Sequence, residues 1–595
     1  MKNRPFVNCI VLLVLFMSFS CDPKTEHEAL KDLPNILLIL TDDQGYGDLG
    51  FHGNPIIQTP FLDQLAKESV RFTNFYVSPV CSPTRASLMT GRYHLRTGVY
   101  DTYMGGSTMA TEEITLAEIL NQNGFRTGLF GKWHLGDNYP YRPQDQGFDE
   151  VLTHIGGGLE QPGDFFENFQ RKDSSYFDPY LIENGKKIQK EGYVTDILTD
   201  EAIAFMDKTE DAPFFCYLAY NAPHGPLEVP QDYLDQYDFD TYPVDSFSIQ
   251  GHDQMDEMQK GDLEKARRVY AMLTNVDDNI GRIRKALEDN GKAENTLIIF
   301  LTDNGPAGRR YVAGMYGRKG SIYEGGTRAP SFWYFPEKKG AQIEIDQLAA
   351  HIDVVPTLLD VLDLKSPPVE MDGMSLKAHL NGEAIAPISR SLFMQWNRGF
   401  PELYQNFAVR TNKYKLTGPY LSKEPLKELQ LFDLEHDPFE ENNLAQALPE
   451  EVSRLKGAYE DWMKEMRSSS NFGAPRPAYL SNGPVRLNRN DWEGPNSHFW
   501  GSMEGHGGWK VYVEEANEYN FRINFQAPVP GHGQFRLRAG MQDRTIANKD
   551  TTLSSFLYQN VYLTEGEHDI EAWYYEYWPQ KEIYGAYEVL IEESK

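Results

Sequence analysis

The sequence contains little cysteine, and its basic residues are few relative to its acidic ones. Only 4 Cys occur among 595 residues, so a fold of this size does not depend on a disulfide framework. Lys and Arg total 57 against 87 Asp and Glu, a formal net charge of -30, which argues against a nucleic-acid-binding protein. A polyanion could be bound only by a local basic pocket. A mean hydropathy of -0.54 excludes a polytopic membrane protein.

The N-terminus carries the features of an export signal. Lys2 and Arg4 precede an apolar run from Phe6 to Phe19, which is too short for a comfortable membrane span. Ser20 and Cys21 follow, and a Cys directly after such a run resembles a bacterial lipoprotein signal, although the preceding residues fit the usual lipobox loosely. We expect residues 1–20 to be a signal peptide and Cys21 to be lipidated. The protein would then lie in the periplasm or on the outer membrane, held by its lipid anchor alone, with simple secretion as the alternative.

Two further cysteines remain in the mature chain. They are Cys81 and Cys216, because Cys9 lies in the expected signal peptide. A disulfide between them stays open at this stage. Cys216 stands in the apolar run 213–220, which favours a buried core residue.

The chain from Leu33 onward alternates short apolar runs with helical patterns, as in an α/β domain with a mostly parallel sheet. The clearest strands are Asn35 to Leu40, Thr127 to Phe130, Pro213 to Tyr220 and Thr296 to Leu301. Helices are expected over Thr59 to Ser69, Glu113 to Asn123, Tyr193 to Asp207, Glu264 to Asn290, His351 to Leu364 (entered near Pro356) and Glu450 to Met466. We predict one large mixed sheet flanked by helices, within a catalytic domain spanning residues 33–467.

The C-terminal part of the chain has a different character. A Ser- and Pro-containing stretch indicates a linker over residues 468–480. Short alternating runs then predict a β-sandwich-like module over 481–595, with strands at Lys510 to Val513, Glu518 to Phe525, Gly533 to Leu537, Ser555 to Leu563 and Glu567 to Tyr575. Its aromatic residues could stack on sugar rings, but most are expected in the core: Trp500, Trp509, Trp573, Tyr574 and Trp578.

Two of the predicted strands end in the same way. Each runs apolar to a Thr and then to two oxygen-bearing side chains, Asp42 and Asp43 in one case, Asp303 and Asn304 in the other. Ligand sites in open α/β sheets lie at the carboxyl ends of strands, and oxygen ligands suit Ca²⁺ or Mg²⁺. Either pair alone could be a turn, but the repetition favours a cation site.

The segment from Cys81 to Arg92 is the most specific feature of the sequence. Cys81 precedes Pro83, where a helix would begin, and a helix N-terminus stabilises negative charge on a nucleophile. The order C-S-P-T-R followed by T-G-R resembles the signature of type I sulfatases, in which the Cys is oxidised to Cα-formylglycine. A plain buried Cys is the alternative.

Further segments resemble the same family, a branch of the alkaline phosphatase superfamily, over about residues 33–444. They are Gly124 to Gly136 (with Phe125 for the usual Tyr), Asn221 to Pro226, Lys319 to Pro330 and Leu431 to Pro438. Singly, each His or Lys in them could be a satisfied core or surface residue. The resemblance implies an alkaline phosphatase-like fold and a sulfuric ester hydrolase.

The resemblance also assigns roles to individual residues. Formylglycine at Cys81 would be the hydrated nucleophile, and one Ca²⁺ would be held by Cys81 with Asp42, Asp43, Asp303 and Asn304. Arg85 and Lys132 would orient and activate the nucleophile, and His134 would be the base that leads to sulfate release. His224 and Lys319 would hold the sulfate and protonate the leaving oxygen. A formylglycine-generating enzyme is thus an implied partner.

The substrate is less closely defined than the reaction. Export and a β-rich module suit an enzyme that acts on a sulfated polysaccharide or its oligosaccharides, by analogy alone. Ulvan, carrageenan, fucoidan and glycosaminoglycans all remain open. Two other functions are a phosphatase or phosphodiesterase of the same superfamily, against which the intact Cys81 signature argues, and a non-catalytic surface glycan-binding lipoprotein, for which missing ligands would be expected.

Overall fold

The structure of the chain is a computed structural model, and it describes residues 33–171, 174–238, 258–340, 342–383, 387–418, 428–481, 483–494, 496–577 and 583–594. The predicted signal peptide and Cys21 lie outside these ranges, as does Trp578. Within them, no helix combines the length and the apolar character that a membrane crossing requires.

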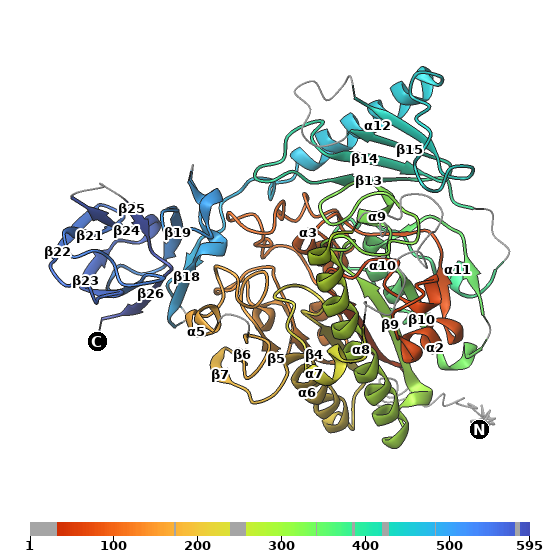
Figure 1. The fold of residues 1–595 in the computed structure, drawn as a ribbon, viewed down its shortest axis with the longest axis horizontal. Coiled ribbons are helices and arrows are strands. Elements are labelled where there is room, and N and C mark those ends of the chain that lie inside the picture. The colour runs from red at the N-terminus through yellow and green to blue at the C-terminus, as the bar shows by residue number, and fades with distance from the viewer. Residues whose placement is uncertain are drawn as a thin grey trace, which may run out of the picture.

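A ten-stranded mixed sheet forms the centre of the larger body (Figure 1), in the order β11-β2-β10-β9-β1-β8-β4-β5-β6-β7. The strands β9, β1, β8, β4 and β5 run parallel to one another. The bounds are β1 Asn35–Thr41, β2 Val70–Phe72, β4 Arg126–Gly131, β5 Glu150–Thr153, β6 Tyr180–Glu183, β7 Lys186–Gln189, β8 Phe214–Ala219, β9 Thr296–Thr302, β10 Ser331–Tyr334 and β11 Glu344–Ile345. This confirms the predicted fold class, and all four predicted strands occur in the sheet.

Helices cover both faces of this sheet because its central strands are apolar on both sides. In β1, Leu37 and Ile39 face one core, whereas Leu38 and Leu40 face the other. The first core includes side chains of α2 (Pro60–Glu68), α6 (Val194–Lys208) and α8 (Lys260–Asp289). The second includes side chains of α3 (Cys81–Thr90), α4 (Leu116–Gln122) and α10 (Val354–Val361). The result is a three-layer α/β sandwich.

Local capping explains where the helices differ from the sequence-based bounds. The helix expected from Glu113 begins at Leu116, because Thr115 and Glu118 form a capping box at its N-terminus. The helix expected from His351 starts as a 3₁₀ turn and becomes α10 at Val354, which leaves Pro356 in the first turn, as predicted. Short helices, not predicted, are α5 Phe166–Gln170, α7 Gln231–Leu234, α9 Glu324–Thr327 and α11 Lys377–Leu380.

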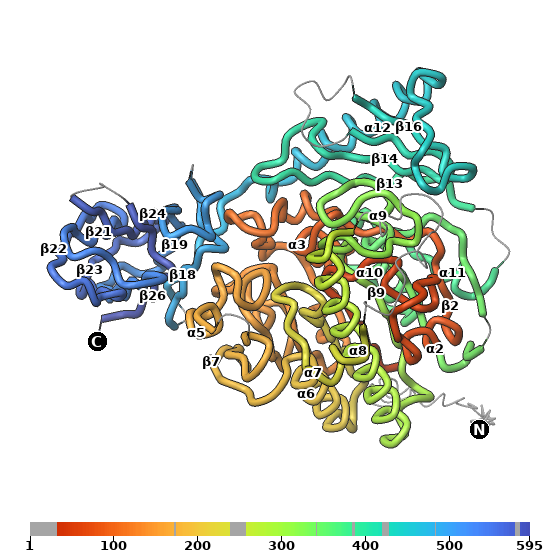
Figure 2. The backbone as a smooth tube through the Cα atoms, viewed as in Figure 1, coloured from red at the N-terminus to blue at the C-terminus, as the bar shows by residue number. Residues whose placement is uncertain are grey.

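A separate four-stranded antiparallel sheet follows the large sheet. It consists of β13 Ser391–Gln395, β14 Phe407–Thr411, β15 Tyr414–Gly418 and β16 Gln430–Asp433. The helix α12 (Pro449–Arg467) packs on it through Tyr459 and Trp462. A third small sheet pairs β3 (Phe75–Tyr76) with β12 (Ala349–Ala350). The antiparallel sheet and α12 lie at the top of Figures 1 and 2.

The C-terminal module, blue in Figure 1, contains a six-stranded and a four-stranded sheet around one core. Its strands are β17 Ala478–Tyr479, β18 Val485–Asn488, β19 Gly508–Val513, β20 Asn517–Asn524, β21 Gly533–Ala539, β22 Gln542–Asn548, β23 Ser555–Leu563, β24 Gly566–Glu576, β25 Ile583–Gly585 and β26 Glu588–Glu593. The end of the expected linker therefore belongs to the module, since β17 pairs with β19. Earlier linker residues contact the body: Ser469 Oγ donates to Arg96 O and Asn471 Nδ2 to Glu113.

Candidate active site

The two strand ends that the sequence singled out meet at one edge of the sheet. The strands β1 and β9 are neighbours, and Thr41 pairs with Thr302. The residues after these two threonines therefore lie side by side at the carboxyl end of the sheet. They are Asp42, Asp43, Asp303 and Asn304, and each is at least 97% buried. The Asp43 amide donates to Asp303 Oδ1 at 3.2 Å, and Asn304 Nδ2 donates to Asp43 Oδ1 at 2.8 Å. The structure thus brings the four predicted oxygen ligands together.

The acidic cluster has the chemistry of a cation site. Asp42 Oδ1 and Asn304 Oδ1 are buried and make no hydrogen bond, which is costly unless another partner satisfies them. Burial, followed by repulsion from Asp42, raises the pKa of Asp303 to about 7, so Arg85 and Lys132 do not fully neutralise the cluster. Ligand atoms of Asp42, Cys81 and Asp303 lie within 4.8 Å of one another. A hard divalent cation fits these residues.

Cys81 is the first residue of α3, beside the acidic cluster. Its side chain is buried, and burial raises the pKa of the thiol despite the nearby Lys132 and Lys319. Position 81 therefore lies at the helix start that the sequence predicted, while loss of solvation raises the pKa of the unmodified thiol more than the two lysines lower it. Cys216 lies in β8, and both cysteines are free, so the open disulfide alternative does not occur.

The imidazole ring of His134 is held with one nitrogen toward Cys81 and the other toward the backbone of Thr102. Its Nε2 lies 2.8 Å from Thr102 O, which fixes the proton on that nitrogen, and its Nδ1 lies 3.5 Å from Cys81 Sγ. Burial, followed by the charge of Lys132, lowers the pKa of His134. Its backbone is left-handed, with φ of 59°. A neutral ring with an open Nδ1 toward position 81 is suited to accept a proton there.

Arg85 and Lys132 lie among the carboxylates and are completely buried. Arg85 donates to Asp303 Oδ2 from Nε and Nη2, at 3.1 and 2.7 Å, and from Nη1 to Lys132 O at 2.9 Å. Lys132 Nζ forms an ion pair with Asp42. Both cations therefore hold the carboxylates of predicted ligands in place.

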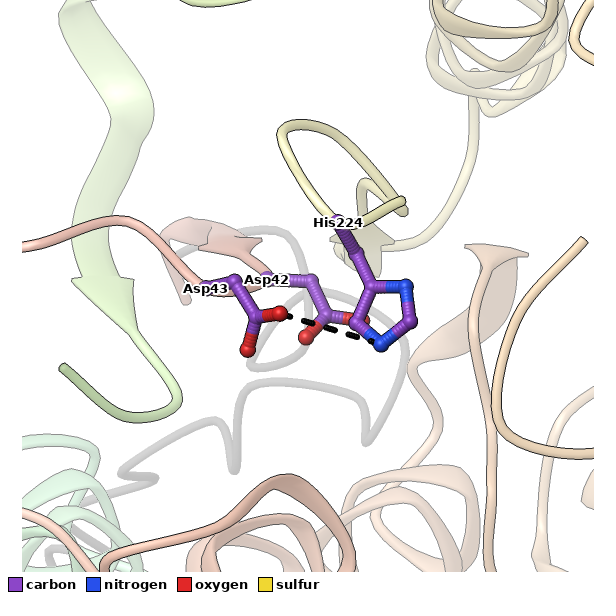
Figure 3. A group of neighbouring side chains, drawn as sticks. All are labelled: Asp42, Asp43 and His224. Carbon is purple, nitrogen blue, oxygen red and sulfur yellow. Dashed lines mark ion pairs between the residues drawn. The ribbon is translucent and has the colours of Figure 1, made fainter. Parts of the chain in front are cut away.

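His224 and Lys319 approach the cluster from its other side. His224 follows β8, and Figure 3 shows its ring beside Asp42 and Asp43, with Nε2 3.7 Å from Asp43 Oδ2. Its Nδ1 lies 2.7 Å from Gly225 O, which leaves Nε2 toward the site. Lys319 Nζ is 2.6 Å from Asp43 Oδ1. Burial alone would lower the pKa of Lys319, but Asp43 raises it above the ordinary value, so the ammonium is kept charged.

Several residues of the site were not predicted from the sequence. Arg310 donates from Nε to Asp48 and from Nη2 to Asp43 O at 2.6 Å, so it holds the segment that carries the predicted ligands Asp42 and Asp43. Gln161 Nε2 lies 3.4 Å from His224 Nε2. A Cβ on Gly157 would lie 2.9 Å from His134 Cε1. The run of three glycines from 156 to 158 was the available signal, since glycine permits such close approach.

The C-terminal module reaches the loop that holds His134. Trp500 stacks on Tyr103 at 4.7 Å, next to Thr102, and Asn490 Nδ2 donates to Ser107 Oγ at 3.0 Å. Trp509 and Tyr574 are buried in the module core, as expected. Trp573 instead faces outward beneath the Arg536 guanidinium, at 5.3 Å. The module thus supports a wall of the site.

The fold and the site define a three-layer α/β enzyme in which basic side chains and an acidic cluster suited to a cation surround a potential nucleophile, Cys81. The family model for Sulfatase matches residues 34–364, and that for N-sulphoglucosamine sulphohydrolase, C-terminal, matches residues 314–468. The chain therefore belongs to the sulfatase family and is a type I sulfatase of the alkaline phosphatase superfamily. It is a sulfuric ester hydrolase. The resemblance seen in the motifs is confirmed.

Similar proteins cover most of the same body. Human arylsulfatase A is 31% identical over 71% of this chain and 86% of its own length. The N-acetylglucosamine-6-O-sulfatase of Bacteroides thetaiotaomicron is 27% identical over 75% and 88%. The solved complex of Ps i-CgsB with k-i-k-neocarrahexaose is 30% identical, with a TM-score of 0.61 over 74% of this chain and 94% of that one.

Proposed function

We propose that this sulfatase hydrolyses sulfate esters on a sulfated polysaccharide or its oligosaccharides, with formylglycine at position 81 and one Ca²⁺. The observation that carries the proposal is the meeting of Cys81, His134, His224 and Lys319 around one buried acidic cluster. Relatives named for sulfated sugars and a solved complex with a neocarrahexaose support a glycan substrate.

The raised pKa of the Cys81 thiol supports conversion of this residue before catalysis. A buried neutral thiol is a poor nucleophile, whereas a hydrated aldehyde at the same position would supply a hydroxyl group. A maturing enzyme with its own oxidant would be needed for the conversion. Ca²⁺ held by Asp42, Asp43, Asp303, Asn304 and position 81 would polarise the sulfate and favour the ionised hydroxyl.

The remaining residues supply charge and proton transfer. Lys319 and His224 would bind the sulfate oxygens, and one of them would protonate the leaving oxygen as the S–O bond to the sugar breaks. That bond's electron pair stays on the sugar oxygen, which becomes a hydroxyl. His134 would accept a proton at Nδ1 from the group at position 81. The net reaction consumes one water and gives the free alcohol and hydrogen sulfate.

Export as a lipoprotein is part of the same proposal. The N-terminal sequence supports it, because a charged start and an apolar run precede Cys21. An enzyme in the periplasm or on the outer membrane would meet polysaccharide fragments directly. Palmitate labelling of the full-length protein in a Gram-negative host would give a labelled band, and Cys21→Ser would abolish it. An unlabelled wild-type protein in the culture medium would favour simple secretion.

The substrate is tested by sulfate release. Protein co-produced with a formylglycine-generating enzyme is incubated with ulvan, carrageenans, fucoidan and glycosaminoglycans and with oligosaccharides of each, and free sulfate is measured by ion chromatography. We expect release from at least one of them, and none from Cys81→Ala. If mass spectrometry shows full conversion of Cys81 and no glycan loses sulfate, the glycan substrate is refuted, and the non-catalytic glycan-binding reading gains if Cys81→Ala binds glycan equally well.

A further inference from the structure

A basic pocket adjoins the candidate active site. It has a volume of about 300 Å³ and is lined by residues between Gly308 and Tyr323, in the segment that follows Asn304 and contains Lys319. Arg309, Arg310 and Arg318 line it, together with Tyr316 and Tyr323. This volume is at the lower end of the range for small-molecule sites.

The charge of this pocket is exceptional for so acidic a protein. The chain has a net charge of -30, and the four other prominent pockets in the described residues each include at least one Asp or Glu in their lining. The basic pocket has none. The side chains of Arg309 and Arg318 are exposed and make neither an ion pair nor a hydrogen bond with any described residue. Two guanidinium groups are therefore available to an external anion.

Arg310 connects the pocket to the reaction centre. It lines the pocket, yet it is only 4% exposed and donates to Asp43 O at 2.6 Å. Lys319 directly follows Arg318. Its ammonium group contacts Asp43, and its backbone amide donates to Pro306 O at 3.1 Å. Arg310 thus contacts both the pocket and the segment that carries Asp43, and Lys319 lies in the same stretch of chain as the pocket lining.

Aromatic rings complete the pocket. Tyr316 is 39% exposed, and its ring packs edge-on against Tyr323 with 4.6 Å between centroids. Tyr323 OH donates to Gln430 at 2.5 Å, which fixes that ring. An exposed tyrosine face beside two arginines suits a sugar ring that carries an anionic group.

We propose that this pocket binds a second sulfate-bearing sugar unit of the glycan, with Arg309 and Arg318 on its sulfate and Tyr316 against its ring. The proposal rests on the glycan function proposed above. It makes the enzyme selective for substrates with more than one sulfate, because only these can fill both sites at once. A carboxylate on a uronic acid would use the same chemistry, so the experiment separates the two anions.

Binding is measured by native gel electrophoresis with dextran sulfate, polygalacturonate or unsulfated dextran in the gel, with unconverted full-chain protein. We expect retardation by dextran sulfate alone, and at least a tenfold loss of affinity in R309A/R318A, partly recovered in R309K/R318K. Arg522→Ala is the matched control, because Arg522 is also exposed and makes no ion pair or hydrogen bond among the described residues. Melting temperatures of all variants verify folding.

The readout does not depend on turnover, so failure of the glycan hydrolysis and failure of the pocket can be told apart. Unchanged affinity of R309A/R318A for dextran sulfate, or an equal loss in Arg522→Ala, would overturn the proposal. Retardation by polygalacturonate as strong as by dextran sulfate, lost in the same double variant, would overturn the assignment to sulfate.

Discussion

Removal of the bound cation should destabilise the protein measurably. Without it, the buried Asp42 Oδ1 and Asn304 Oδ1 have no partner, at about 1–3 kcal/mol for each unsatisfied group, or about 2–6 kcal/mol together. A body of roughly 430 residues has an unfolding entropy of about 0.9 kcal/mol per kelvin. The expected decrease in Tm on removal of the cation is therefore about 2–7 °C.

Differential scanning fluorimetry of EDTA-treated protein, titrated with Ca²⁺ or Mg²⁺, measures this decrease. A second group near the surface, Asp433, Glu435 and His436, could also bind a metal, so the shift must be assigned by variants. Asn304→Ala removes one of the unpartnered oxygens and should shrink the shift, whereas Glu435→Gln should retain it. The same Tm with EDTA and with millimolar cation, or a shift lost only in Glu435→Gln, would refute the reasoning.

Three further predictions concern other parts of the molecule. Lys415 Nζ lies 2.8 Å from Glu324 and 3.0 Å from Glu440, and all three side chains are buried. Lys415→Met leaves both carboxylates without their shared partner, so it should lower the free energy of unfolding in urea by about 3–5 kcal/mol. A decrease below about 1 kcal/mol would contradict this prediction. Burial lowers the pKa of His351 to about 3, so stability that is present above pH 6.5 is lost as the pH falls, by about 2 kcal/mol at pH 5. His351→Gln should therefore lose less stability than wild type between pH 7 and pH 5. An equal loss in the variant and in wild type would refute this prediction. His134→Ala should lower kcat for an aryl sulfate by about 10²–10⁴ with a smaller change in KM, whereas the exposed His436→Ala should match wild type; equal kinetics of both variants would remove His134 from the mechanism.

The sequence was most informative where a pattern occurs twice or where a motif is long. The repeated strand ends at Asp42 and Asp303 predicted one shared site, and the pairing of β1 with β9 brings them together. The segment from Cys81 to Arg92 predicted the family from its residues alone. Both signals are local, so tertiary packing does not have to be known to recognise them.

Other features depend on packing and could not be predicted. The burial that raises the pKa of the Cys81 thiol depends on the packing around α3. The antiparallel sheet of β13 to β16 has short strands that share a core with α12, far along the chain. Arg310 contacts Asp43 across 267 residues, and Trp573 lies between the buried Ala572 and Tyr574, so it faces away from the module core.

The central claim is that position 81, once converted, hydrolyses sulfate esters. The most direct measurement is the turnover of 4-nitrophenyl sulfate and 4-nitrophenyl phosphate by protein made with and without a formylglycine-generating enzyme, with conversion of Cys81 quantified by mass spectrometry. We predict sulfatase turnover proportional to the converted fraction and far slower phosphate hydrolysis. Equal sulfatase turnover of converted and unconverted protein, or faster phosphate hydrolysis by both, would contradict the account.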